Sequence, residues 1–151
     1  MDKVREYLKQ YNMDDKIIEF DASTATVELA AKALNCEEAR IAKTLSFRLS
    51  DRCIVIVTAG DKKIDNAKYR GEFGEKAKML HYEEVLDVIG HPVGGVCPFA
   101  VNDGVEIYLD NSLKEYTTVF PACGSSHNAI EITPSDLERV TNSIEWVDVT
   151  K

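Results

Sequence analysis

The first half of the chain contains a run of six almost entirely apolar residues, Cys53-Ile54-Val55-Ile56-Val57-Thr58. A strand that is apolar on both faces is typical of the interior of a sheet that is covered on both sides. The run ends at Ala59-Gly60-Asp61, a turn signal. It therefore predicts the central strand of a sheet, around which the other segments must be arranged.

The remaining elements follow from hydrophobic period and from caps. Thr26 can cap one helix that Asn35 closes, and Thr133-Pro134 is typical of the start of another. We expect helices over residues 1–12, 27–34, 37–42, 66–73 and 82–89 and from residue 134 onward, and strands over 17–20, 44–49, 53–58, 77–80, 105–109, 118–120, 129–132 and 144–149. Lys43 would then stand at a helix-to-strand junction.

Short strands are mixed with short helices, and they do not alternate regularly. This pattern favours an α/β fold of the α+β type, with a curved, mixed, partly barrel-like sheet flanked by short helices, over a doubly wound parallel sheet. The chain has 151 residues, of which 44% are hydrophobic. That size predicts one domain over residues 1–151, with a core that needs no disulfide or metal.

Charge and composition exclude several classes of protein. Lysine and arginine total 18 against 26 aspartates and glutamates, a net charge of −8 that argues against DNA and against any wide nucleic-acid footprint. The end of a nucleic acid stays open as a partner, because a few cations and amides can hold one or two phosphates.

No apolar run approaches the roughly 20 residues of a membrane span, and the charged start does not resemble a signal peptide. We expect a cytoplasmic protein with no membrane partner.

A loop with two adjacent glycines lies between two predicted elements. Gly94 and Gly95 allow the backbone to approach a ligand and to point amides at it, while Pro92 and Pro98 stiffen the turn. Such a loop can bind an oxyanion or a carbonyl oxygen. The alternative is a tight connection with no ligand.

Two further positions are candidates for chemistry. The Lys43 ammonium at a sheet rim can hold a phosphate or polarise a carbonyl, or it can be a solvated surface charge. The loop Gly124-Ser125-Ser126-His127 suits recognition of a small polar group, or it is an exposed hairpin. His127 has no nucleophile motif or carboxylate pair around it in the sequence, and we expect Cys97 and Cys123 to be buried thiols. No metal is expected, because the histidines and cysteines lack ligand spacing.

Taken in order, four segments resemble the YbaK and prolyl-tRNA synthetase editing-domain family. They are Thr26-Val27-Glu28-Leu29-Ala30-Ala31, Ile41-Ala42-Lys43-Thr44-Leu45-Ser46-Phe47, Gly94-Gly95-Val96-Cys97-Pro98-Phe99 and Ala122-Cys123-Gly124. Tyr108-Leu109-Asp110 before a short helix adds to the resemblance, which spans nearly the whole chain.

The resemblance implies a freestanding trans-editing enzyme without a cofactor. It would hydrolyse the ester that joins a wrong amino acid to tRNA, most often tRNA for proline carrying cysteine, alanine or another small amino acid. Lys43 would hold the phosphate of the terminal adenosine or the substrate carbonyl, and Gly94 and Gly95 would cradle the aminoacyl group. The substrate-binding set expected from the resemblance and the loops is Thr26, Val96, Pro98, Phe99, Asp110, Gly124, Ser125, Ser126 and His127.

The loop around Ser125 departs from the cysteine-specific members of that family. Its hydroxyl groups could favour serine, threonine or alanine, because a site built to bond a hydroxyl rejects analogues without one. The expected partners are the acceptor end of a charged tRNA and a synthetase. The alternatives are a non-catalytic module that binds an aminoacyl-nucleotide-like ligand, and a structural domain in which Lys43 is exposed and far from Gly94 and Gly124.

Overall fold

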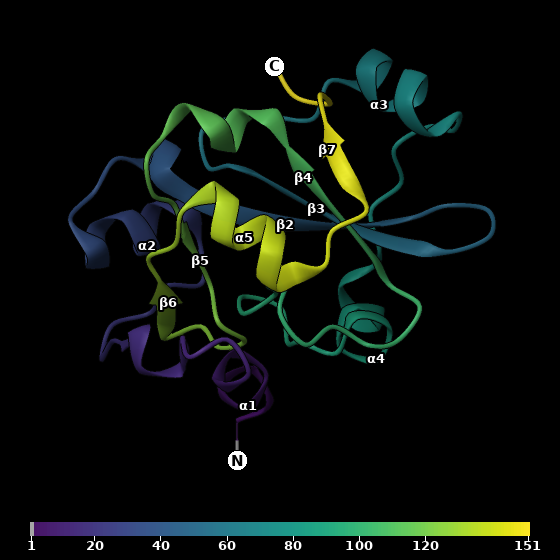
Figure 1. Ribbon diagram of the computed structural model, residues 1–151. Coiled ribbons are helices and arrows are strands. Elements are labelled where there is room, and N and C mark those ends of the chain that lie inside the picture. The colour runs from purple at the N-terminus through teal and green to yellow at the C-terminus, as the bar shows by residue number, and fades with distance from the viewer. Residues whose placement is uncertain (1) are drawn as a thin grey trace.

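The apolar run forms β3 (Cys53–Ala59), which is the middle strand of a five-stranded sheet in the computed structural model (Figure 1). The structure describes residues 2–151. The strand order is β5 (Phe120–Pro121), β2 (Ile41–Arg48), β3, β4 (Glu106–Asp110) and β7 (Glu145–Val147). The β2–β3 pair is antiparallel and the other neighbours are parallel, so the predicted mixed sheet is confirmed.

A second, two-stranded sheet lies beside the first. It pairs β1 (Ile17–Glu19) with β6 (Asn128–Ile130) in antiparallel register. An isolated antiparallel bridge joins Val119, just before β5, to Ile132, just after β6. This small sheet therefore brings the segment after β1 close to the loop that precedes β6.

Helices cover both faces of the large sheet, as the apolar character of β3 requires. Val55 and Val57 pack with residues of α1 (Lys3–Lys9), α4 (Val85–Ile89) and α5 (Pro134–Thr141) on one face. Ile54 and Ile56 pack with α3 (Asn66–Phe73) on the other. Figure 1 shows α5 lying across one face of the central strands, while α3 lies at the far end of the molecule, near the C-terminus.

One edge of the second face is covered by α2 (Val27–Leu34), whose Ala30 and Ala31 pack against β2 and β5. The Thr26 hydroxyl accepts a hydrogen bond from the Leu29 amide at 3.1 Å, and Asn35 ends the helix in the left-handed region. The predicted bounds of this helix are confirmed. The Thr26 cap thus fixes the point at which the loop over residues 20–26 ends and α2 begins.

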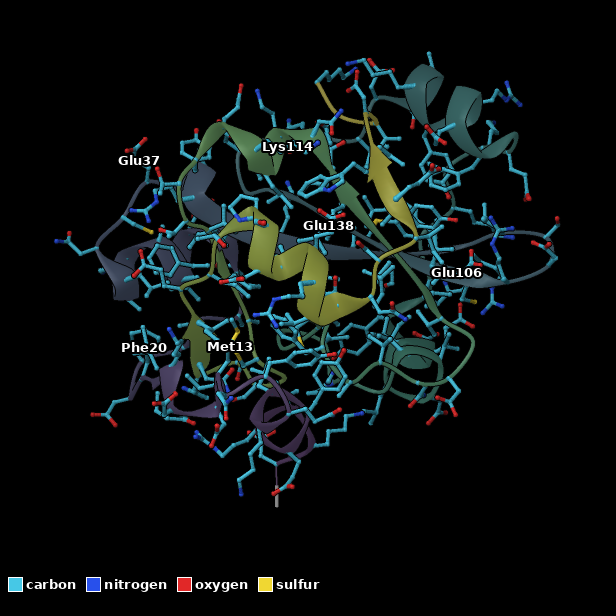
Figure 2. All side chains as sticks on the ribbon, in the orientation of Figure 1. Met13, Phe20, Glu37, Glu106, Lys114 and Glu138 are labelled. Atoms are coloured by element: carbon cyan, nitrogen blue, oxygen red, sulfur yellow. The ribbon has the colours of Figure 1, made fainter. Side chains whose placement is uncertain are left out.

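The face under α5 also holds a small aromatic contact. The Lys114 ammonium lies 4.3 Å from the Trp146 ring centre, and the Trp146 indole donates to the Glu138 carboxylate at 3.1 Å. Figure 2 labels Lys114 and Glu138, which lie on η4 (Asn111–Glu115) and α5. Because the indole N–H of Trp146 has a hydrogen-bond partner, the ring can pack against α5 while Trp146 remains partly exposed.

Three predicted elements are different in the structure. Residues 37–42 are not a helix: a single 3₁₀ turn, η2 (Glu38–Arg40), is followed directly by β2, so Lys43 is the third residue of a strand. Residues 77–80 make only one bridge, from Met79 to Phe47. The start of 82–89 is the 3₁₀ turn η3 (Tyr82–Glu84), and a further turn, η1 (Asp14–Lys16), precedes β1.

These differences share a cause, because each segment is too short for local period to decide its conformation. Within residues 2–151, no helix combines the length and the apolar character that crossing a membrane requires.

Candidate functional site

A pocket lies along the edge of β2 that faces away from β3. β5 pairs with β2 only at Ile41 and Ala42. Farther along, the segment before α4 takes over that edge, with the Leu80 amide donating to the Ser46 carbonyl at 3.1 Å. A pocket of about 460 Å³ lies beside the gap between these two contacts.

The wall of this pocket is mostly apolar, with a few polar groups. Both faces of β2 contribute to it, because the pocket wraps around the strand edge. The apolar lining comes from Ala25, Val27, Ala30, Ile41, Ala42, Leu45, Met79, Leu80, Val85, Val93, Val96, Phe120, Ala122 and Ala129, and the rest from Thr24, Thr26, Lys43, Thr44, Ser46, Tyr82, Gly94 and Asn128. An apolar cavity with a few convergent polar groups is the usual form of a small-ligand site.

Lys43 is held by the turn that follows β3. Its Nζ donates to the carbonyl of Gly60 at 3.3 Å and to the carbonyl of Lys62, both in the turn after β3. An ammonium has three donors, so one N–H remains for a ligand. Burial lowers the pKa of Lys43, Asp61 opposes this effect and Lys63 adds to it. The half-buried cation is thus oriented by main-chain carbonyls and not by a carboxylate partner.

Three loops meet at the part of the pocket wall that Ala25 and Gly94 form. A β-carbon on Gly94 would lie 3.2 Å from the Ala25 β-carbon, and one on Gly95 would lie 2.7 Å from the Ser125 nitrogen. The Thr24 amide donates to the Ser126 carbonyl at 2.5 Å. The glycine loop therefore fits between the loop before α2 and the loop before β6 because it has no side chains there.

The amides of the glycine loop are not equivalent. Gly95 N–H donates to the Pro92 carbonyl at 2.9 Å, so the structure uses this amide to close the turn. The Gly95 amide is therefore committed to the turn, and the predicted role of Gly95 in cradling the aminoacyl group stays a prediction. For Gly94 and Val96, both of which line the pocket, the described residues provide no hydrogen-bond acceptor for the amide. Those two amides are the ones free to meet a ligand.

Pro98 and Phe99 lie behind the loop rather than in the pocket lining. The Phe99 side chain is fully buried, and its carbonyl lies 2.6 Å from His91 Nε2. Burial lowers the pKa of His91, the bond to Phe99 opposes this effect, and the nearby Lys3 and Asp2 act in opposite directions. This arrangement indicates a neutral His91 that supports the loop from beneath.

Asp110 is also outside the pocket lining. Its buried carboxylate accepts from the Ser112 amide at 3.0 Å, from the Val149 amide at 2.9 Å and from the Thr150 hydroxyl at 2.8 Å. These three bonds tie the end of β4 to the C-terminal segment. The structure thus shows Asp110 holding the C-terminal segment, and its expected role in binding substrate stays a prediction.

The segment Gly124-Ser125-Ser126-His127 supports the pocket without lining it. The Ser125 hydroxyl accepts from the His127 amide at 3.0 Å, and the exposed His127 ring lies 3.1 Å from the Ala22 carbonyl. The Asn128 side chain, in contrast, lines the pocket and bonds both the amide and the carbonyl of Cys123. The Ser125 hydroxyl, one of the groups predicted to select the substrate, is therefore engaged in holding the loop.

The cysteines and histidines offer no alternative chemistry at this site. Burial raises the pKa of Cys97 to about 12 and raises that of Cys123 well above its ordinary value, so both thiols stay protonated. Among the described residues, no three histidine, cysteine, aspartate or glutamate side chains gather into a possible metal site. The polar groups that line the pocket point instead to binding through hydrogen bonds and one cation.

The structure brings together Thr26, Lys43, Gly94 and Val96 around one pocket, which excludes the arrangement expected of a purely structural domain, with Lys43 far from Gly94. Their roles in catalysis and binding stay predictions. Sequence reasoning missed Thr44, Ser46, Met79 and Tyr82 as pocket residues. The available signal was two hydroxyl side chains, at positions 44 and 46, on one face of a predicted strand beside Lys43.

The chain is similar to proteins of known family. The model of the "Aminoacyl-tRNA editing domain" matches residues 21–140. The uncharacterized protein YwhH of Bacillus subtilis (strain 168) is 52% identical over 149 residues, which cover 98% of this chain and 95% of the relative. The proline–tRNA ligase of Bacillus cytotoxicus is 23% identical over 124 residues, which cover 82% of this chain but only 22% of the ligase.

A solved structure agrees with these relatives. It is the crystal structure of a candidate trans-editing enzyme for prolyl tRNA synthetase, with a TM-score of 0.88, 28% sequence identity and coverage of 99% of this chain and 95% of that chain. The fold, the matched residues and the pocket at Lys43 agree with the resemblance of the four sequence segments. The chain belongs to the aminoacyl-tRNA editing domain family.

Proposed function

We propose that this protein is an aminoacyl-tRNA deacylase that acts in trans and hydrolyses the ester of a mischarged tRNA. One observation carries the proposal: Lys43, with one uncommitted N–H, and the free amides of Gly94 and Val96 line the same pocket. A cation and two main-chain donors suit the negative charge that develops on a carbonyl oxygen during ester hydrolysis.

The reaction needs no protein nucleophile, because an ester is already activated. A water oxygen attacks the carbonyl carbon, and the carbonyl oxygen takes the negative charge. As the carbonyl reforms, the bond to the ribose oxygen breaks and that oxygen receives a proton, leaving a free amino acid and an uncharged tRNA. Lys43, Gly94 and Val96 would hold the ester and stabilise the charged intermediate, so that positioning and electrostatics supply the catalysis. The attacking water could be assisted by a hydroxyl of the tRNA or of the amino acid.

The substrate that we propose is tRNA for proline that carries a small amino acid. Its volume of about 460 Å³ must hold part of the terminal nucleotide as well as the aminoacyl group. Cysteine, alanine or another small residue fits that limit. The choice of tRNA is supported by the likeness to proline–tRNA ligases and to the candidate trans-editing enzyme.

The rim of the pocket offers a place for the terminal base. Met79, Tyr82 and Val93 are exposed by 55%, 75% and 48% and line the pocket. An exposed aromatic ring beside apolar neighbours is a surface on which a base can stack. We assign the adenine of the acceptor end to Tyr82, which leaves the aminoacyl group pointing inward toward Lys43.

The charge of the chain limits how much of the tRNA it can grip. With a net charge of −8, the protein would touch only the acceptor end, and a synthetase in the cytoplasm would hold the rest. The alternative function is a non-catalytic module that holds an aminoacyl-nucleotide-like ligand in the same pocket. The deacylase and the binding module would use the same contacts with the ligand. Only the deacylase would hydrolyse it, so a measurement of turnover distinguishes the two functions.

The test is deacylation of a panel of tRNAs charged with proline, alanine, cysteine, serine or threonine. Wild type should release a small, non-cognate amino acid, and Lys43→Ala should lose this activity while it stays folded. Lys63→Ala is the matched control, because Lys63 is a neighbouring cation outside the pocket lining. Equal rates for wild type and Lys43→Ala would reject the mechanism. Binding of a charged acceptor end with no turnover anywhere in the panel would favour the module.

A further inference from the structure

A second cavity, which we call the α3 cavity, lies beside α3 and has a volume of about 550 Å³. Part of its lining comes from α3 and part from the segment that leads from α3 toward α4, a connection that Figure 1 shows in teal. The lining residues are Asn66, Ala67, Arg70, Gly71, Lys76 and Ala77. Among residues 2–151, this lining includes two cations and no carboxylate, although the chain has 26 acidic residues and 18 basic ones.

The two cations of the α3 cavity have no anionic partner within the described chain. Both side chains are exposed, and neither forms an ion pair or a hydrogen bond there. The neighbouring carboxylates are engaged elsewhere. Asp65 caps the start of α3, and Glu75 accepts two hydrogen bonds from the turn between β2 and β3. Burial and the adjacent Glu145 of β7 raise the pKa of Glu72, so this carboxylate lies toward β7. The cavity therefore presents uncompensated positive charge.

The α3 cavity and the pocket at Lys43 lie on the same face of the large sheet. Phe47 packs against α3, and Lys43 points to the same face because it lies four residues earlier in β2. Met79 is opposite Phe47 in an antiparallel bridge, and Ala77 follows the same alternation and packs into the same cluster. Met79 lines the pocket and Ala77 lines the α3 cavity, so only Lys78 separates the two linings along the chain.

The spacing of the two sites sets the length of a ligand that reaches both. With Met79 opposite Phe47, Ala77 lies six positions from Lys43 along the edge of β2. At about 3.3 Å per residue, this separation is about 20 Å. A single nucleotide is too short to span it. The acceptor strand of a tRNA continues beyond its terminal adenosine, and each further nucleotide adds one negative phosphate.

We propose that the α3 cavity is a second, anion-binding subsite, in which Arg70 and Lys76 hold a backbone phosphate of the acceptor strand while the aminoacyl end occupies the pocket at Lys43. Arg70 supplies a planar fork of donors and Lys76 a compact charge, both of which bind phosphate. The strand leaves the pocket over the exposed Met79 side chain. This inference rests on the proposed function and adds a contact with the tRNA backbone to it.

A local contact of this kind is compatible with the net charge of −8. Salt screens exposed charges beyond about 8 Å at physiological ionic strength, so a phosphate in the α3 cavity is influenced mainly by the two cations beside it. Phosphate contacts position a nucleic acid and do not read its bases. The subsite should therefore strengthen binding of the acceptor strand and leave the choice of amino acid unchanged.

The test compares two stable ligands in which an amide replaces the ester. One is an acceptor-stem RNA helix that carries alanine at its 3′ end, and the other is 3′-alanylamino-3′-deoxyadenosine, which has no phosphate. Arg70→Gln combined with Lys76→Gln should lower affinity for the helix by about tenfold and leave affinity for the nucleoside unchanged. It should also reduce the slope of log Kd against log salt concentration by about 1–2, because one or two phosphate contacts are lost.

Lys9→Gln combined with Lys16→Gln is the matched control, because it removes the same two positive charges. Both lysines are exposed and form no ion pair in the described part of the chain. They lie on α1 and on the turn after it, and Figure 1 shows α1 at the opposite end of the molecule from α3. This control should bind the helix as wild type does. Equal losses for both double variants, or no loss for either, would overturn the subsite.

Gly71→Ala is a second control within the α3 cavity itself. It alters the lining and keeps both cations, and a β-carbon there meets no atom within 4 Å. It should bind the helix with the affinity of wild type. An acidic protein segment is the other polyanion that two cations could hold, and poly-L-glutamate represents it. If its binding depends on Arg70 and Lys76 as strongly as binding of the helix does, the assignment to RNA is wrong.

Hydrolysis of the same helix with alanine in ester linkage separates this inference from the proposed function. The Arg70 and Lys76 double variant should raise KM and leave kcat unchanged, because a remote phosphate contact binds substrate and transition state alike. Binding that depends on the two cations, without hydrolysis, would support the subsite and reject the deacylase. Hydrolysis with equal kcat/KM in wild type and the double variant would support the deacylase and reject the subsite. If wild type does not bind the helix, both are rejected.

Discussion

The backbone of Gly95 lies against the backbone of Ser125, so closely that a β-carbon on residue 95 would stand 2.7 Å from the Ser125 nitrogen and 2.8 Å from the Gly124 carbonyl carbon. The two loops come from chain segments about thirty residues apart and touch only because residue 95 has no side chain. This contact fixes the turn from which Gly94 and Val96 present their free amides. The positions of these two amides in the pocket therefore depend on Gly95, a residue that does not line the pocket.

Gly95→Ala should disturb this contact and lower activity. The added methyl group meets main-chain atoms that cannot rotate away, so the glycine loop must move. We expect the free energy of unfolding to fall by about 1–3 kcal/mol, as for overpacked sites, and deacylation to fall by about tenfold or more because the amides shift. Chemical unfolding and deacylation rates measure both effects.

Gly71→Ala is the matched control for that prediction. A β-carbon on Gly71 has no atom within 4 Å, and the residue lies inside α3. Alanine is the better helix former there, so the free energy of unfolding should rise by about 0.5–1 kcal/mol with no change in activity. If Gly95→Ala behaves like Gly71→Ala, the close packing of the two loops is not what positions the amides.

The sequence predicted the frame of the fold and part of the site. The apolar run ending at Thr58 predicted the central strand, and the caps at Thr26 and Thr133 predicted two helix starts, because both signals are local. Lys43 was predicted at a rim and is instead inside β2. Residues 37–42 combine helix-forming and strand-forming side chains, and only the pairing with β3 and β5 decides where the strand begins.

The missing part of the site depends on contacts that no local pattern contains. Thr44 and Ser46 alternate as any strand residues would, and nothing in the sequence says that the neighbouring strand stops after Pro121. Gly95 was expected to donate to the substrate, but its amide is used by Pro92. Asp110 was expected in the pocket, but three donors from distant segments satisfy its carboxylate. Which polar groups are left free is a property of the folded chain.

Thr44→Val should make the ligand-free protein more stable. The substitution replaces a buried hydroxyl that has no partner in the described chain with a methyl group of the same shape. Removing that unpaired group should raise the free energy of unfolding by about 1 kcal/mol. Urea unfolding without ligand measures the change. Thr141→Val removes a paired hydroxyl and should lower stability by a similar amount, so a fall for both variants would contradict an unpaired Thr44.

Tyr82→Ala should weaken binding of the acceptor end without changing the fold. The ring is 75% exposed, so its removal leaves no cavity in the core. Loss of one base–aromatic stack should cost about 1–3 kcal/mol of binding free energy, measured by titration with a charged acceptor-stem analogue. Leu86→Ala is the control, because Leu86 is also exposed, by 56%, but lies outside the pocket lining. Equal losses for both variants would rule out stacking on Tyr82.

His91 should make stability depend on pH below its ordinary pKa of about 6.5. Burial lowers the pKa of His91 in the folded protein, so the unfolded chain binds the proton first as the pH falls. Stability is therefore unaffected above about pH 6.5 and declines below it, down to the folded pKa, with a slope of at most about 1.4 kcal/mol per pH unit from this group. His91→Gln, which can still donate to Phe99 but does not titrate, should have a shallower slope in urea unfolding between pH 7.5 and 5.5. Identical slopes would mean that His91 is not held neutral.

Lys43→Ala should separate activity from stability. The ammonium bonds two carbonyls in a turn, and water can replace it there because the side chain is only half-buried. The free energy of unfolding should therefore fall by no more than about 1.5 kcal/mol. The loss of a preorganised cation at the developing oxyanion should instead lower kcat/KM by about 100- to 1,000-fold. Single-turnover deacylation and urea unfolding of the same preparations test this pair of values. A large loss of stability with a small loss of rate would show that Lys43 serves the turn after β3 and not the ester, since Gly60 and Lys62 would then be its only essential partners.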